Sequence, residues 1–253
     1  MLSFKEKLIN KQTIVGTMLS EISTPNIVRI LGSVGFEYII IDCEHGYFDY
    51  SQVANIVALC NGIGLPVIIR IPTISRECIT KYMDMGTNGI LVPMTNTCED
   101  VKNVVKWAKY SPQGTRGIST TRAHSNYNVQ SLSNYMEKAN KDTIILVQIE
   151  TKEAVKNINE IVNVHGIDGV IIGPNDMAGD YGTPGNFNTV EMQQSIKRVI
   201  EAAEKANKPS GIITSNISFI GQCMENGMTI FSCNSEVGMI IKAGKEIIME
   251  LKK

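Results

Sequence analysis

Eight short apolar runs alternate with eight segments of helical periodicity along this chain. The runs begin near Thr13, Glu37, Pro66, Gly89, Thr143, Gly169, Ser210 and Thr229. Strand followed by helix, repeated in this way, is typical of a parallel sheet covered by helices. Eight such repeats in 253 residues favour a closed (β/α)8 barrel, a TIM barrel, over an open doubly wound sheet. No GxGxxG motif follows the first run, which also argues against a dinucleotide-binding fold.

Composition and charge indicate one barrel domain over residues 1–253 that binds neither nucleic acid nor membranes. Apolar residues make up 43% of the chain, enough for a full core. The formal net charge of −1 offers no positive surface to nucleic acid or an anionic membrane, and no apolar run approaches a membrane span. The six cysteines form no CxxC pair, and the N-terminus lacks the apolar core of a signal peptide. We therefore expect reduced thiols and a cytoplasmic protein.

Charged side chains stand at the ends of the second and third predicted strands. The run EYIII is followed by Asp42, Glu44 and His45. The run PVII is followed by Arg70. Barrel enzymes carry their active sites at the carboxyl ends of the strands, so these groups should meet there. Asp42 and His45 fit either a helix cap with a surface histidine or a base whose tautomer the carboxylate fixes. Arg70 is either a structural partner of Glu44 or a cation aimed at a developing oxyanion.

Two further carboxylates, Glu150 and Asp176, follow the fifth and sixth predicted strands. Each alone could cap a helix, but together they are typical of two oxygen ligands of a hard divalent cation. Such a site leaves positions for water and substrate, which suits Mg²⁺ or Mn²⁺, with Co²⁺ as a third candidate, better than Zn²⁺. Gln148 should face the same interior, where it either contacts substrate or satisfies a core polar group. Backbone amides of Asn175 and Asp176 could hold a substrate carboxylate.

One long polar connection, from Ser111 to Tyr127, interrupts the regular alternation. A connection of this length in a compact barrel is more often functional than not, although the pattern assigns no role to its His124. Asp84 closes a helical segment just before Gly86 and is as consistent with a solvated turn as with a site.

Several stretches, taken in order, resemble the HpcH/HpaI aldolases, metal-dependent class II enzymes that act on 2-oxo acids. They are GFEYIIIDCEHG, PVIIRIP, GTNGILVPM, YSPQGTRGIS, VQIET with AVKNINEI, and GVIIGPNDMAGDYG. The resemblance runs from near Thr13 to near Gly211. It implies a (β/α)8 barrel whose last helix is exchanged between neighbours, in a hexamer built as a dimer of trimers. Thr17 and Met18 depart from it, since relatives more often carry an aromatic residue after the first-strand glycine.

The resemblance also implies roles for individual residues. It implies a divalent metal on Glu150 and Asp176, with pyruvate chelated to that metal. It places Arg70 next to the pyruvate oxygen, makes His45 and Asp42 an acid/base dyad, and puts Asp84 near a subunit boundary at the site. No lysine stands out at a strand end, which argues independently against a Schiff-base aldolase.

We therefore expect a lyase that reversibly cleaves 4-hydroxy-2-oxo acids to pyruvate and an aldehyde through a metal-bound enolate. Its expected partners are these small molecules and other copies of the chain. A second hypothesis uses the same enolate chemistry in a Claisen-type citrate synthase or a citrate-like lyase. A third, a barrel that binds a metabolite without catalysis, is disfavoured because the costly charges at the strand ends are all present.

Overall fold

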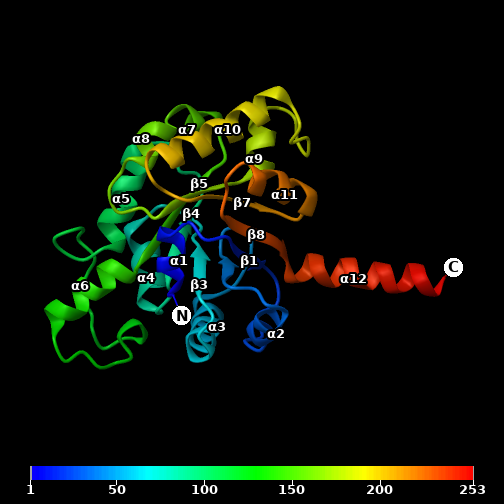
Figure 1. Cartoon of the computed structure of the whole chain (residues 1–253). Coiled ribbons are helices and arrows are strands. Elements are labelled where there is room, and N and C mark those ends of the chain that lie inside the picture. Colours follow the sequence, from blue (N-terminus) through cyan, green and yellow to red (C-terminus); the bar gives the residue numbers. More distant parts are fainter. Residues whose placement is uncertain (1, 253) are drawn as a thin grey trace.

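A computed structural model describes residues 2–252 and has a closed barrel of eight parallel strands, each paired with the next in the chain (Figure 1). The strands are β1 (Ile14–Leu19), β2 (Ile39–Asp42), β3 (Val67–Arg70), β4 (Gly89–Val92), β5 (Ile144–Ile149), β6 (Gly169–Ile172), β7 (Ser210–Thr214) and β8 (Ile230–Ser235). Pairing of β8 with β1 closes the barrel, with a register shift between Gly16 and Met18. The predicted (β/α)8 barrel is confirmed.

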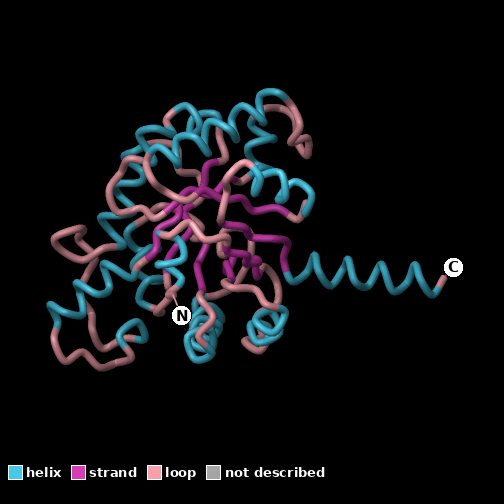
Figure 2. The backbone as a smooth tube through the Cα atoms, viewed as in Figure 1, coloured by secondary structure: helices cyan, strands magenta, loops and turns pink. Residues whose placement is uncertain are grey.

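Helices surround the barrel (Figure 2). They are α1 (Phe4–Ile9), α2 (Ile27–Val34), α3 (Tyr50–Ile63), α4 (Arg76–Asp84), α5 (Cys98–Ala108), the 3-10 turn η1 (Ala123–Ser125), α6 (Leu132–Asp142), α7 (Lys152–Lys156), α8 (Ile158–Val162), α9 (Pro174–Asp180), α10 (Val190–Lys205), α11 (Ile217–Glu225) and α12 (Glu236–Leu251). Caps fix many of their ends: Asp49 forms a capping box at the start of α3, and Gly64 ends it in the left-handed region.

Two stretches differ from a single strand–helix repeat. Residues 152–162, which have one helical pattern, form α7 and α8 with a break at Asn157. The side-chain amide of Asn157 donates a hydrogen bond to the carbonyl of Asn96, which favours the local bend over a continuous helix. The connection after α5 holds η1 and then α6, which packs its tyrosine, Tyr135, edge-on against Tyr110.

The apolar core has two shells, and the inner one determines where a site can form. The outer shell lies between strands and helices, and the inner shell fills the barrel itself with side chains such as Met18, Ile68, Leu91 and Ile171. At the N-terminal end of the barrel, Phe4 of α1 stacks on Tyr38 at 5.1 Å between ring centroids. Because that end is closed by apolar packing, polar groups gather at the opposite, C-terminal end of the strands.

The last helix, α12, points away from the barrel (Figure 1). Of its residues only Glu236, the first, is buried. Its exposed apolar side chains are Ile240, Ile241, Ile247, Ile248, Met249 and Leu251. Within residues 2–252, no helix has both the length and the apolar character needed to cross a bilayer.

Candidate active site

Asp42 and Arg70 form the centre of the polar cluster at the strand ends. They are direct neighbours in the register of β2 and β3, and both are buried. Arg70 donates two hydrogen bonds to Asp42, from Nε to Oδ1 at 2.9 Å and from Nη2 to Oδ2 at 2.7 Å. Oδ1 also accepts the backbone N–H groups of Glu44 and His45, at 3.0 and 3.2 Å. The Asp42 carboxylate is therefore fully engaged.

Glu44 stands between Arg70 and His45. Its carboxylate lies 3.2 Å from Nη1 of Arg70 and 4.0 Å from Nε2 of His45. Burial raises the pKa of Glu44, although the charge of Arg70 opposes this. The His45 side chain is 66% exposed, so its ring faces the open mouth. The predicted dyad differs here: Asp42 holds the backbone of His45, whereas the carboxylate near the imidazole is that of Glu44.

Glu150 is a buried carboxylate at the end of β5. It accepts the backbone N–H of Met94 at 2.6 Å and a hydrogen bond from Nε2 of Gln148. Burial raises the pKa of Glu150, and the negative charge of Asp176 adds to this effect. Oε1 of Gln148 is also buried and has no hydrogen-bond partner in the described structure. A buried carboxylate and a buried carbonyl oxygen without a hydrogen-bond partner are both costly, and a cation bound next to them would stabilise both.

Gly173, at the end of β6, keeps space open beside this carboxylate. A Cβ at Gly173 would lie 2.5 Å from Oε2 of Glu150 and 2.8 Å from Nε2 of Gln148. Asp176 and Asn175 follow in the first turn of α9, and both are exposed.

These residues fit a hard divalent cation. Glu150 and Asp176 offer oxygen ligands from neighbouring strand ends, and Gln148, which has an unpaired oxygen, is hydrogen-bonded to Glu150. Among residues 2–252, no three His, Cys, Asp or Glu side chains are grouped to hold a metal. A cation there would consequently take most of its ligands from water and substrate, as Mg²⁺ and Mn²⁺ readily do.

Met94 is a site residue that the sequence analysis missed. Its backbone has a φ of +50°, which is uncommon for a residue other than glycine, and this turn aims its N–H at Glu150. The turn follows β4 in the stretch VPMTNT, and nothing in its composition signals the conformation.

Asp84 lies at the other end of the molecule from Glu150. It is the last residue of α4, and helices that return between parallel strands end at the N-terminal side of the barrel. There it accepts a hydrogen bond from Nη2 of the buried Arg116 at 2.6 Å, and Nε2 of His124 lies 3.6 Å away. Within its own chain Asp84 therefore lies away from the strand ends that carry Glu150, and its place near a subunit boundary at the site stays a prediction.

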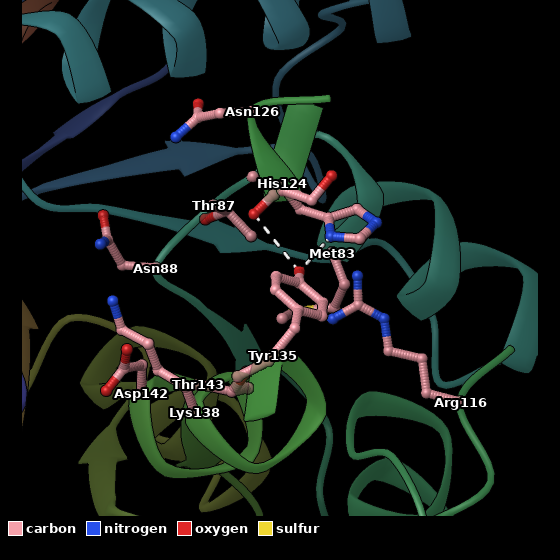
Figure 3. A pocket seen from close by; sticks show the side chains of 13 residues that line it. Met83, Thr87, Asn88, Arg116, His124, Asn126, Tyr135, Lys138, Asp142 and Thr143 are labelled. Atoms are coloured by element: carbon pink, nitrogen blue, oxygen red, sulfur yellow. Dashed lines mark hydrogen bonds between the residues drawn. The ribbon is translucent and has the colours of Figure 1, made fainter. Parts of the chain in front are cut away.

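His124, together with Arg116, lines a pocket of about 350 Å³ (Figure 3). Tyr135 is hydrogen-bonded to its Nδ1, and the carbonyl of Ser119 lies 2.9 Å from its Nε2. Burial and the charge of Arg116 lower the pKa of His124. With both ring nitrogens engaged, His124 holds the long connection in place rather than facing the strand ends.

Comparisons with known proteins identify the family of this chain. A family model described as HpcH/HpaI aldolase/citrate lyase matches residues 17–243. The 5-keto-4-deoxy-D-glucarate aldolases of Shigella sonnei (strain Ss046) and Escherichia coli O139:H28 are each 31% identical over 251 residues, covering 99% of this chain and 96% of their own. An HpcH/HpaI aldolase structure from Desulfitobacterium hafniense DCB-2 is 27% identical, covers 100% of this chain and 98% of its own, and has a TM-score of 0.95. The chain belongs to the HpcH/HpaI aldolase/citrate lyase family.

Proposed function

We propose that this protein is a metal-dependent aldolase that cleaves a 4-hydroxy-2-oxo acid to pyruvate and an aldehyde. The observation that carries the proposal is the guanidinium of Arg70, which Asp42 and Glu44 hold at the same strand ends where the buried Glu150 lies. The charge of Glu150 contributes to the pKa shifts of both Arg70 and Glu44, so the ends of β2, β3 and β5 form one electrostatic unit. Such a unit supports an assignment of Arg70 as a fixed cation and Glu150 as a metal ligand at one site.

The relatives' substrate supports the chemical class. The name 5-keto-4-deoxy-D-glucarate describes a keto group next to a terminal carboxylate, then a methylene, then a carbon bearing a hydroxyl. Numbered from that carboxylate, this is the 4-hydroxy-2-oxo acid pattern. An aldol cleavage breaks the bond between the methylene and the hydroxyl-bearing carbon.

A divalent cation on Glu150 and Asp176 would act as a Lewis acid toward the 2-oxo acid. Arg70 would stabilise the negative charge that develops on the keto oxygen, since Asp42 and Glu44 already fix its orientation. His45, exposed at the mouth, would take the proton of the C4 hydroxyl, directly or through a water. The C3–C4 bond then breaks and the aldehyde leaves. The electron pair of the broken bond stays with C3 and forms the enolate, which becomes pyruvate on protonation at C3.

The roles of the remaining residues follow from their places. Gln148 would contact the substrate through its unpaired oxygen or its amide, and the backbone amides of Asn175 and Asp176, at the start of α9, would bind the substrate carboxylate. We further propose that other copies of this chain cover the apolar face of α12, giving the hexamer that the family resemblance implies.

A substrate screen tests the proposal. Purified protein is incubated with pyruvate, a panel of aldehydes, and Mg²⁺, Mn²⁺ or Co²⁺, and product formation is followed by mass spectrometry. We expect metal-dependent formation of 4-hydroxy-2-oxo acids, and their cleavage in the reverse assay. Condensation of oxaloacetate with an acyl-CoA, without any aldol activity, would instead favour the citrate synthase alternative.

A further inference from the structure

The first residue of α12 holds the loop that follows β1. Glu236 is 2% exposed, and its carboxylate accepts backbone N–H groups from three consecutive residues of that loop. Oε1 accepts from Ser20 at 2.9 Å, from Glu21 at 2.6 Å and from Ile22 at 3.0 Å, and Oε2 accepts from Ser20 at 3.0 Å. The hydroxyl of Ser20 also donates to Oε2, at 3.3 Å. One carboxylate thereby fixes the conformation of a three-residue segment.

That segment, residues 20–22, packs directly on the loop that carries Glu44 and His45. A Cβ at Gly46 would lie 2.8 Å from the carbonyl oxygen of Ser20 and would overlap the carbonyl of Asp42, so only glycine permits this approach. A second link is a short hydrogen bond from the hydroxyl of Tyr47 to the carboxylate of Glu21. Segment 20–22 therefore bridges α12 and the loop of residues 43–48.

We propose that Glu236 is a positioning residue for catalysis: it orders segment 20–22 and, through Gly46 and Tyr47, sets the loop that carries Glu44 and His45. Glu236 touches neither substrate nor metal in this scheme. The inference rests on the proposed function for the role of His45, but the structural coupling does not depend on it. Through this coupling, the conformation of the loop that carries Glu44 and His45 depends on the position of Glu236 at the start of α12.

The chemistry of the contact indicates a sharp variant. Glu236→Gln keeps the size of the side chain but removes its negative charge and replaces one acceptor oxygen by an NH2 group, which cannot accept the two hydrogen bonds that Oε2 receives from Ser20. Since the carboxylate is buried, the lost acceptor is not replaced freely by water. Glu246→Gln is the matched control, because Glu246 lies on the same helix and is exposed.

Hydrogen exchange measured by mass spectrometry on the full-length protein tests the coupling without any assay of activity. In Glu236→Gln we expect amide exchange to quicken by roughly tenfold in peptides covering residues 17–27 and also in peptides covering residues 43–48. Glu246→Gln should leave both unchanged. Faster exchange in the first peptides alone would overturn the coupling, and faster exchange throughout the barrel would mean that Glu236 only maintains the fold.

Activity provides the second readout. A displaced His45 loop should slow aldol cleavage by roughly tenfold while oxaloacetate decarboxylation, which needs no hydroxyl base, falls much less. An equal fall in both reactions would overturn the positioning role. If Glu236→Gln does not fold, Tyr47→Phe breaks the second link alone and should shift the same ratio in the same direction. If the proposed function is wrong, the wild-type protein lacks aldol activity but the hydrogen-exchange result is unchanged. If the coupling is wrong, the hydrogen-exchange result fails although the wild-type protein is active.

Discussion

Arg70 and Asp42 meet across neighbouring strands through two parallel hydrogen bonds of 2.9 and 2.7 Å. This pairing fixes the plane of the guanidinium and leaves Nη1 beside Glu44, at 3.2 Å. An arginine held in this way needs no rearrangement as charge develops on a bound substrate, which is the condition for strong electrostatic stabilisation.

The first prediction concerns this geometry. Arg70→Lys keeps the charge but cannot form two parallel hydrogen bonds, so the cation is no longer held in place. We expect kcat/KM for aldol cleavage to fall by roughly 10²–10³-fold, within the range for loss of one oxyanion-stabilising group. Circular dichroism should show an unchanged fold. Activity within a few fold of the wild-type value would mean that the fixed plane of Arg70 does not matter.

The second prediction concerns the metal. A cation held by two protein carboxylates and otherwise by water and substrate is removable by chelation. EDTA should abolish activity, and Mn²⁺ or Mg²⁺ should restore it. Glu150→Gln and Asp176→Asn should each prevent restoration without unfolding the barrel. Full activity in a sample shown by elemental analysis to contain no metal would refute the proposed class.

The third prediction concerns pH. Burial raises the pKa of Glu150 in the folded chain above the value of 4.5 that it has in the unfolded chain. The stability that the protonated carboxyl contributes is therefore fully present below pH 4.5. That contribution is lost as pH rises through the folded pKa. In EDTA, Glu150→Gln should therefore melt about 2–4 °C above the wild-type protein at pH 7, a shift that corresponds to about 1 kcal/mol.

The comparison at lower pH completes this test. The difference in melting temperature should shrink toward pH 4, where the wild-type carboxyl is protonated as well. Asp176→Asn is the control, since Asp176 is exposed and should change the melting temperature less. Equal melting of Glu150→Gln and wild type at every pH would show that burial of this charge is compensated elsewhere.

The fourth prediction separates His45 from Arg70. Aldol cleavage needs a base for the hydroxyl and a stabilised enolate, whereas decarboxylation of oxaloacetate needs only the enolate. His45→Ala should slow aldol cleavage by roughly 10²–10⁴-fold and affect decarboxylation much less. Arg70→Ala should reduce both. If His45→Ala lowers both equally, His45 is not the hydroxyl base.

The fifth prediction concerns assembly. The apolar face of α12 is long and exposed, which is unfavourable unless another copy covers it. We expect a hexamer by light scattering, and Ile241→Glu combined with Ile248→Glu should reduce the mass. Lys245→Glu, at an exposed polar position of the same helix, is the control. A fully active wild-type monomer at micromolar concentration would contradict the prediction.

Local pattern was enough to predict the barrel and the placement of four charges, because strand ends in a parallel barrel all point to one mouth. Asp42, Arg70, Glu150 and Asp176 each follow an apolar run, and each lies at a strand end or in the turn after it. Contacts between them were harder to predict. Which side chain Asp42 binds depends on the register of β2 and β3, and that register places Arg70 opposite it rather than the ring of His45.

Other features depend on contacts that no local pattern contains. Asp84 lies at the opposite end of the barrel from Glu150, because a helix that returns between strands carries its last residue there, so its predicted role depends on contacts between chains. The Met94 amide is a backbone group whose role depends on an unusual φ. Glu236 and Ser20 lie 216 residues apart in sequence, so their contact appears only when β8 closes on β1.

Gly173 has a consequence for attempts to alter this protein by directed evolution. Any side chain there would occupy the space beside Glu150, so a saturation library at this position should yield only the parental codon among active clones. Gly46 should be equally intolerant, because its neighbours are backbone carbonyls that cannot rotate away. Useful diversity must then come from other positions, whose side chains are exposed and take no part in these contacts. Libraries restricted to such positions should retain a far larger share of folded, active variants.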